Sequence, residues 1–509
     1  MKINPFIFRG YDIRGLVDQD LNSEIVEHLG KAFGTFLNRL SIKKVVVGYD
    51  SRATSPKFSQ AIGKGLNWAG IDIINIGLNL VGTFYWSQYY LNCKGGVFVT
   101  ASHNPVEYNG FKLANDFSET LVSDNIQKLC QMVENEDYEQ AETKGRSEER
   151  DIKKVYFEDL LKRLPIRKKF KVVIDPSYST AGAIVPDLLR RAGCEVIEKN
   201  CQLDSSFPLG VPDPTSIIVA QRLGNEVWQE KADIGFSYDA DGDRIGIVDE
   251  RGNIVWNDVL VALFTIDVLN EHPGATIMYN TLCSKAVEET IVKYGGRPFM
   301  WRTGHSFLKK KNQEVKAAFI GELSGHFFFS ADFYNHDDGL YSTLRLLSYL
   351  AKTNQSLSAA IDSLPKYISS PEIKIYCADD KKVELINKIS KVIKKEYPGA
   401  KNGEEDKSSS LPTELSQKAK VKKKAELSSP FAVARVIDDE RAGDGVRVDL
   451  QTCMFVIRYS QNAPYLTIKF EAKTENQYIF LKNYISKLLH SYKEIDWDSK
   501  INVNTESLS

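Results

Sequence analysis

One local pattern occurs three times along this chain. A run of β-branched apolar residues stops at a turn of small polar residues, and an amphipathic stretch typical of a helix follows. The three copies read KKVVVGYDSRATS, FKVVIDPSYSTAG and GATIMYNTLCSKA. Buried parallel strands are continuous Val/Ile runs, and the loop after such a strand is where α/β proteins bind anions. The pattern therefore predicts three α/β units in tandem.

The rest of the chain predicts a fourth and different unit. With 509 residues the chain is too long for one hydrophobic core. Its last part runs through the strand-like CMFVIRYS and YLTIKFEAKT to the helical stretch NQYIFLKNYISKLLHSY, which favours a small α+β domain. Hydrophilic stretches mark the candidate boundaries. We expect α/β domains at residues 1–150, 151–255 and 256–368, and an α+β domain at residues 369–509.

A stretch near residues 400–430 differs in composition from its surroundings. It reads KNGEEDKSSSLPTELSQKAKVKKKAELSSP and contains almost no large apolar residues. Such a segment cannot bury enough surface to fold alone, so we predict a disordered insertion that acts as a solvated tether. The alternative is that its KVKKK cluster contacts an acidic partner.

Charge and cysteine usage restrict the classes of partner. The chain has 66 basic and 67 acidic residues, so no global field attracts nucleic acid or an anionic membrane. A small anionic ligand held by a local site is expected. The seven cysteines are scattered and odd in number, which fits a reducing compartment, and the N-terminus lacks the apolar core of a signal peptide. We expect a soluble cytoplasmic protein, monomeric or weakly dimeric.

The strongest local signal is SYDADGDRIGIVDERG, which contains Asp239, Asp241 and Asp243. Three carboxylates within five residues repel one another unless a hard cation lies among them, and oxygen ligands suit magnesium or calcium. A calcium loop would place Glu250 twelfth, but its sixth position is Arg244 rather than Gly, and the flanks GFSY and IGIV predict strands instead of helices. A purely structural Asp-rich turn remains the alternative to a metal loop.

The second signal is GGVFVTASHNPVEYNGFKL, in which a buried-strand pattern runs into a polar loop containing Ser102. We expect this serine to be exposed at the strand end, near backbone N–H donors, where it could accept and return phosphate. An ordinary turn is the alternative. Adjacent side chains seldom point at each other, so we do not expect His103 to form a protease-like pair with Ser102, and no G-x-S-x-G elbow is present.

Two further stretches offer ligands for a phosphorylated sugar. GELSGHFFF contains Glu322 and Ser324, which could hydrogen-bond vicinal hydroxyls, and it follows TGHSFLK. RYSQNAPYL contains Arg458 and Ser460, a guanidinium fork and a hydroxyl that could clamp an anion.

Taken together and in this order, FRGYDIRG, TASHNP, DADGDR, GELSGH and an Arg-x-Ser loop resemble the α-D-phosphohexomutase superfamily, in particular its phosphomannomutase/phosphoglucomutase branch. The match spans nearly the whole chain. The resemblance implies an α/β fold of four domains around a central cleft, the last being a smaller, mobile lid. It also implies that Ser102 is phosphorylated and that Mg²⁺ is held by Asp239, Asp241, Asp243 and a phosphate oxygen on Ser102.

The resemblance implies roles for the remaining motif residues. Those near the transferring phosphate or involved in proton transfer are Arg14, Lys112, Arg244 and His305. Those that read the sugar hydroxyls are Glu322 and Ser324, with His326 nearby, and those that grip the other phosphate are Arg458, Ser460 and Asn462. The last loop departs from the family, which usually has Thr-Glu-Pro after the serine, whereas this chain reads QNAP at 461–464. The amide of Asn462 can still donate where the Thr would.

The function implied is the interconversion of a hexose 6-phosphate and a hexose 1-phosphate through a bisphosphate, with glucose 1,6-bisphosphate or mannose 1,6-bisphosphate as activator. Ser rather than Gln in GELSGH leans toward mannose and glucose phosphates. The alternatives are a phosphoglucosamine mutase, a phosphatase, and a non-catalytic relative that binds a sugar phosphate.

Overall fold

The computed structural model describes residues 2–397, 435–461 and 463–508. The chain forms two compact units. The first unit comprises the residues up to Ile277 together with His305–Leu364, and the second comprises Met278–Gly304 together with the residues from Pro365 onward. The predicted insertion near residues 400–430 lies outside the described residues, and the four domain boundaries remain a prediction.

The first sheet of the first unit has the strand order β1-β5-β4-β2-β3-β7, with β6 paired to β5. Strands β2, β3, β4 and β7 run parallel, and β5 is antiparallel to β1 and β4. The strands are β1 (Ile13–Leu16), β2 (Lys44–Tyr49), β3 (Asp72–Leu78), β4 (Gly95–Val99), β5 (Tyr108–Asp116), β6 (Glu119–Thr120) and β7 (Ser147–Glu149). The helices are η1 (Pro5–Ile7), α1 (Ser23–Arg39), α2 (Ser55–Trp68), α3 (Val81–Tyr90) and α4 (Asp124–Glu134).

Both faces of this sheet are buried, which explains its continuous Val runs. Val45 and Val47 of β2 join the core formed with α1, α2 and α4, whereas Val46 joins a separate core with α3. Alternate residues of a strand point to opposite faces, so a strand covered on both sides must be apolar throughout. The first copy of the repeated pattern therefore forms the predicted strand, turn and helix.

A second sheet follows in the first unit, with the order β12-β11-β10-β8-β9. Its strands are β8 (Lys171–Asp175), β9 (Glu195–Glu198), β10 (Ile234–Tyr238), β11 (Ile245–Val248) and β12 (Ile254–Val255), and its helices are α5 (Lys153–Arg163), η2 (Thr180–Ala183), α6 (Val185–Arg191) and α7 (Ile217–Glu230). β10 pairs in parallel with β8 and antiparallel with β11, so the DADGDR turn joins two buried neighbouring strands. The strand character expected for its flanks is confirmed.

The remaining elements of the first unit are α8 (Asn257–Glu271), α10 (His305–Val315), β15 (Phe319–Gly321), β16 (Phe327–Phe328), α11 (Gly339–Thr353) and α12 (Leu357–Asp362). Strand β13 (Thr276–Asn280), from the third copy of the pattern, spans the division between the units. β15 and β16 pair antiparallel, and the loop between them carries the ELSGH residues.

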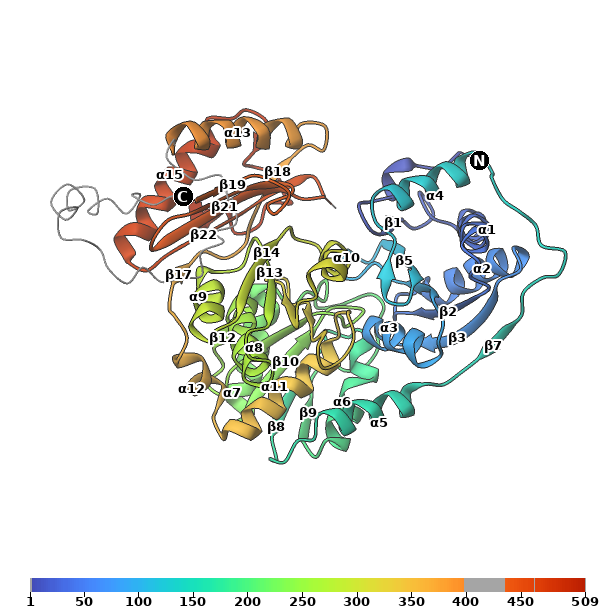
Figure 1. Ribbon diagram of the computed structural model, residues 1–509, viewed down its shortest axis with the longest axis horizontal. Helices are drawn as coiled ribbons and strands as arrows, with labels where there is room; N and C mark the ends of the chain where they lie inside the picture. Colours follow the sequence, from blue (N-terminus) through green and yellow to red (C-terminus); the bar gives the residue numbers. More distant parts are fainter. Residues whose placement is uncertain (1, 398–434, 462, 509) are drawn as a thin grey trace. The chain divides into compact units, whose positions relative to one another are not determined.

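The second unit contains an antiparallel sheet with the order β19-β20-β21-β22-β18-β23, and β17 pairs with β22. Helices α13 and α15 cover one face of it (Figure 1). The strands of this sheet are β17 (Ile368–Ser369), β18 (Ile373–Cys377), β19 (Arg435–Ile437), β20 (Gly445–Asp449), β21 (Cys453–Tyr459), β22 (Tyr465–Ala472) and β23 (Ile495–Asp496). Strand β14 (Arg297–Trp301) also lies in this unit but not in this sheet. The helices are α9 (Lys285–Lys293), α13 (Lys382–Glu396), α15 (Glu475–His490) and η3 (Thr505–Leu508). The predicted C-terminal α+β character is confirmed.

None of the helices in the described parts of the chain has both the length and the apolarity that a membrane crossing requires.

Candidate active site

The turn between β10 and β11 brings the three predicted carboxylates together. Asp239, Asp241 and Asp243 are at most 1% exposed, and each offers an oxygen within 4.8 Å of the others. Gly242 has φ of +68°, a conformation that side chains rarely adopt, and this tight turn keeps all three carboxylates on one side. Glu250, the twelfth residue of the calcium-loop alternative, instead accepts a hydrogen bond from Ser358 N at 3.3 Å.

Two buried cations neutralise part of this charge. Lys112 Nζ, on β5, lies 3.1 Å from Asp241 Oδ2 and also contacts Asp243 Oδ2. Arg244 Nε donates to Asp239 Oδ2 at 2.9 Å. Burial and the charge of Asp241 raise the pKa of Asp239. Burial would likewise raise the pKa of Asp241, but the ammonium of Lys112, the hydrogen bonds to Asp239 and Lys112, and the charge of Arg14 together outweigh it and lower that pKa.

The carboxylates retain capacity for a further cation. Asp241 Oδ1 and Asp243 Oδ1 are buried and accept no hydrogen bond, which is costly for a charged oxygen unless a ligand completes it. All the donor atoms are oxygens, the set that Mg²⁺ or Ca²⁺ prefers. The cluster is therefore a candidate metal site.

Ser102 lies in the loop between β4 and β5, directly against this cluster. Its hydroxyl donates to Asp239 Oδ2 at 2.7 Å, and its N–H donates to Thr100 Oγ1 at 2.8 Å. Its backbone is left-handed, with φ of +47°. Two expectations were wrong. Ser102 is only 3% exposed, because the DADGDR turn covers it, and the adjacent His103 does point at it, with Nδ1 at 3.1 Å from Oγ.

Arg14, on β1, supports the same loop. Its guanidinium donates to Asn104 Oδ1 at 2.6 Å and to the carbonyl of Ala101 at 3.3 Å. Asp12 Oδ2 lies 2.6 Å from Arg14 Nη2 and holds the side chain from the other side. Burial alone would lower the pKa of Arg14, but Asp12 raises it, so the group stays charged.

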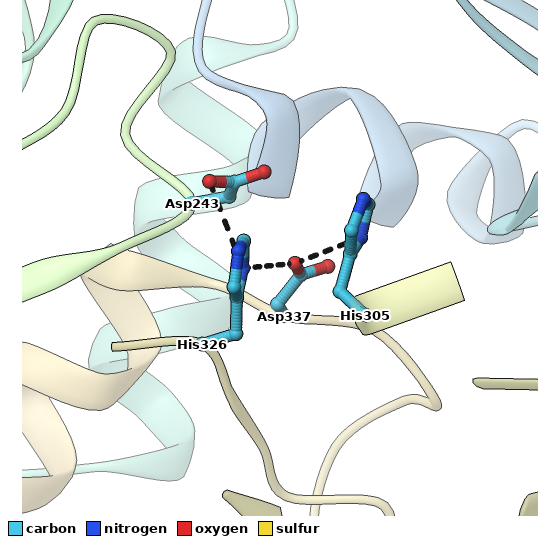
Figure 2. Close-up of side chains that lie close together, drawn as sticks. All are labelled: Asp243, His305, His326 and Asp337. Atoms are coloured by element: carbon cyan, nitrogen blue, oxygen red, sulfur yellow. Dashed lines mark ion pairs between the residues drawn. The ribbon is translucent and has the colours of Figure 1, made fainter. Parts of the chain in front are cut away.

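Two histidines meet across a carboxylate that sequence reasoning missed. Figure 2 shows Asp337 between His305 and His326. Asp337 Oδ2 lies 2.6 Å from His326 Nδ1 and 3.2 Å from His305 Nδ1, and His326 Nδ1 is 3.7 Å from Asp243 Oδ1. The two rings stack with centroids 4.9 Å apart. The sequence signal available was the pair of adjacent aspartates in NHDDGL.

The two histidines are driven toward opposite protonation states. Burial lowers the pKa of His305, and Asp337 does not fully offset it. Burial would also lower the pKa of His326, but Asp243 and Asp337 outweigh it, so that pKa is raised. Site pairs whose environments push their pKa values apart are suited to divided acid and base roles.

The β15–β16 loop places Glu322 and Ser324 in this first unit as well. Glu322 is 1% exposed, and its N–H donates to the carbonyl of His326 at 3.0 Å. Ser324 is half-buried. A bridge between Arg244 and His326 ties this loop to the DADGDR turn, so the two motifs lie side by side.

The predicted phosphate-gripping residues lie in the second unit. Arg458, at the end of β21, pairs both arms of its guanidinium with Asp444, with Nε at 2.9 Å from Oδ1. The carbonyl of Ser460 accepts a hydrogen bond from Lys382 Nζ at 2.6 Å, a support that sequence reasoning missed. Asn462 lies outside the described residues.

Comparison with known proteins gives one consistent family. Models for the phosphoglucomutase/phosphomannomutase α/β/α domains I, II and III match residues 5–140, 154–252 and 256–367. A phosphomannomutase/phosphoglucomutase of Pseudomonas putida is 35% identical over 469 residues, covering 92% of both chains.

The solved structures agree with this result. A phosphoglucomutase/phosphomannomutase family protein of Burkholderia thailandensis has a TM-score of 0.81 at 29% identity, covering 96% of this chain and 98% of that one. An Aspergillus fumigatus N-acetylphosphoglucosamine mutase, described in complex with GlcNAc-6P and magnesium, shares the fold alone, with a TM-score of 0.54 at 13% identity and 96% of each chain covered. The chain belongs to the phosphoglucomutase/phosphomannomutase family of phosphohexomutases, which are intramolecular phosphotransferases.

Proposed function

We propose that the protein interconverts the 6-phosphate and 1-phosphate of mannose, glucose or both, with Ser102 as the residue that carries the phosphate. The observation that supports this most is the 2.7 Å contact between Ser102 Oγ and Asp239, inside a buried cluster that also holds Lys112 and Arg244. A serine phosphate of about −1.5 to −2 charge needs such neighbours to persist.

Asp239, Asp241 and Asp243, with a phosphate oxygen on Ser102, would hold Mg²⁺. When bound, the ion supplies positive charge that stabilises the transferring phosphoryl group. Lys112 and Arg244 add positive charge on either side of the carboxylates. The magnesium named for the Aspergillus relative is consistent with this proposal.

Each half-reaction exchanges one phosphate ester for another. The bond from phosphorus to Ser102 Oγ breaks and the released Oγ takes up a proton, while a bond from phosphorus to a sugar hydroxyl oxygen forms and the proton of that hydroxyl passes to a base. His305 suits that role because its lowered pKa keeps it neutral, while Asp337 orients it. His326, whose pKa is raised, and Arg14 would stabilise the negative charge of the transferring phosphate. The bisphosphate then turns, its other phosphate passes to Ser102 Oγ as that hydroxyl releases its proton, and the base returns a proton to the sugar oxygen that the phosphate leaves.

Recognition of the sugar would rest on Glu322 and Ser324. A carboxylate can accept from two vicinal hydroxyls at once. Arg458, Ser460 and Asn462 would grip the phosphate that is not transferred. Glucose 1,6-bisphosphate or mannose 1,6-bisphosphate would act as activator, because either rephosphorylates Ser102 after loss of the intermediate. We propose a monomer or weak dimer with no macromolecular partner.

A coupled assay tests the proposal. The parent protein is incubated with Mg²⁺, glucose 1,6-bisphosphate, and mannose 1-phosphate, glucose 1-phosphate or glucosamine 1-phosphate, and formation of the 6-phosphate is followed. We expect turnover with mannose or glucose phosphate and a phosphate on Ser102 by intact mass. Preference for glucosamine phosphate would indicate a phosphoglucosamine mutase. Phosphate release without isomer formation would indicate a phosphatase, and binding without turnover a non-catalytic relative.

A further inference from the structure

The first copy of the repeated sequence pattern ends in a turn that the proposed chemistry leaves without a role. This turn, DSRATS, joins β2 to α2 and contains Asp50 and Arg52. The side chain of Arg52 is 2% exposed, so its charge is buried without access to water. A buried guanidinium is retained only where its donors are well used, because it cannot lose its proton.

The donors of Arg52 are aimed at the backbone of the Ser102 loop. Nη2 donates to the carbonyls of Ser102 and Asn104, both at 2.6 Å. Nη1 donates to the carbonyls of Pro105 at 2.8 Å and Tyr108 at 3.0 Å. One side chain thus binds four carbonyls within residues 102–108, from the loop and the first residue of β5, and a change of loop conformation would break some of these hydrogen bonds.

The other side of the Arg52 guanidinium faces a buried carboxylate with which it forms an ion pair but no hydrogen bond. Asp50 Oδ2 lies 3.4 Å from its Nε, and Asp50 Oδ1 accepts from Ser55 Oγ at 2.6 Å at the start of α2. The ring of Phe207 packs over the guanidinium at 5.3 Å. Arg52 is therefore held between Asp50, at the end of β2, and the ring of Phe207. Such contacts restrict the positions that its guanidinium can take.

The loop has a need for such a template. Ser102 adopts a left-handed backbone with φ of +47°, and a residue that is not glycine holds that conformation only when its surroundings impose it. A serine that gives and regains phosphate must also present Oγ at the same point in both half-reactions. Arg52 contacts Ser102 through the carbonyl and leaves the hydroxyl to Asp239.

We propose that Arg52 is a positioning residue for phosphoryl transfer, which fixes the Ser102 loop through four backbone carbonyls and so aligns Ser102 Oγ in both half-reactions. The inference rests on the proposed role of Ser102. Misplacing a reacting atom by about 1 Å costs about 100-fold in rate. The guanidinium nitrogens Nη1 and Nη2 donate to backbone carbonyls of residues 102–108, so the loss of Arg52 should act on kcat and spare the KM for hexose phosphate.

The test compares Arg52→Ala and Arg52→Lys with the parent, using kcat per phosphorylated chain, the phosphate content being read by intact mass. We expect kcat to fall about 100-fold in Arg52→Ala with KM changed less than about threefold. Arg52→Lys keeps the charge, but its single nitrogen cannot reach both carbonyl pairs, so kcat should also fall, by about 10-fold or more. Millimolar guanidinium chloride, far below denaturing concentrations, should partly restore kcat in Arg52→Ala.

Arg345→Lys is the matched control, since Arg345 is an equally buried arginine of the first unit that pairs with Asp267, Glu271 and Asp332 away from the Ser102 loop. It should lower the melting temperature without changing kcat per phosphorylated chain. The proposal is overturned if folded Arg52→Lys keeps the parent kcat, if KM rises as much as kcat falls, or if the control loses kcat equally. If Arg52→Ala does not fold, Arg52→Lys alone decides. If the parent never carries phosphate on Ser102, the proposed function fails instead.

Discussion

Lys112 shares its partners with the proposed metal ion, and this leads to an unusual prediction. Its ammonium lies 3.1 Å from Asp241 Oδ2, contacts Asp243 Oδ2, and is 2% exposed. A cation bound by these carboxylates would be repelled by Lys112. We predict that Lys112→Met, which keeps an apolar stem but removes the charge, binds Mg²⁺ more tightly than the parent while it loses most of its turnover.

The size of the effect follows from the geometry. A magnesium–oxygen distance of about 2.1 Å, added to the 3.1 Å from Asp241 Oδ2 to Lys112 Nζ, puts the two cations up to about 5 Å apart. Charges of +1 and +2 at that distance repel by about 3 kcal/mol at an effective dielectric constant of about 40, between about 20 for buried groups and about 80 for water. The Kd for Mg²⁺ should therefore fall about 100-fold. Turnover should fall about 100- to 1,000-fold, because Lys112 stabilises charge on the transferring phosphoryl group.

Calorimetric titration of each dephosphorylated protein with MgCl₂ measures the affinity, and the coupled assay measures turnover. Lys309→Met is the matched control, because Lys309 is also buried in the first unit but donates to the carbonyl of Ser118 at 2.8 Å and packs on the Tyr85 ring. Its effect on the Kd should stay within about threefold. Equal or weaker Mg²⁺ binding by folded Lys112→Met would refute the reasoning, since Lys112 would then not compete for the carboxylates.

Three further predictions concern other residues of the first unit. Glu322→Gln should lower kcat/KM for hexose phosphate by about 10- to 100-fold, because a charge-assisted hydrogen bond contributes about 1.5–3 kcal/mol; an unchanged value in the coupled assay would exclude Glu322 as a sugar ligand. Burial raises the pKa of Asp338 to about 6, so its contribution to stability is present below its unfolded pKa and is lost as pH rises through about 6. The free energy of unfolding of Asp338→Asn, measured relative to that of the parent, should therefore increase by about 1.5 kcal/mol as the pH rises from about 5 to 7.5. The same difference between the two proteins at both pH values, measured by thermal unfolding, would contradict this. Arg345→Met removes the arginine that pairs with the buried Asp267, whereas Glu271 keeps Lys352 and Asp332 keeps His272, and it should cost about 3–5 kcal/mol, seen as a lower melting temperature; an unchanged melting temperature would show that the cluster is solvated.

The local sequence was enough to predict the main strands and turns, and most of the motif residues that lie in the candidate site. Buried strands must be apolar on both faces, so the Val/Ile runs predicted β2, β8 and β13 with the turns that follow them. The spacing of Asp239, Asp241 and Asp243 predicted their convergence, because five residues of one tight turn cannot separate three carboxylates. These features rest on periodicity and short-range geometry, which a single sequence contains.

Only the tertiary structure decided which distant groups face one another. Asp337 lies between His305 and His326 because the β15–β16 loop, the start of α10 and the start of α11 pack together, and no local pattern encodes that meeting. Ser102 is buried rather than exposed because a turn 137 residues away covers it. Arg52 reaches four carbonyls because β2 and β4 are neighbours in the sheet, so the turn after β2 lies beside the loop after β4. Such contacts depend on strand register and side-chain packing across elements, and these become defined only when the whole unit has folded.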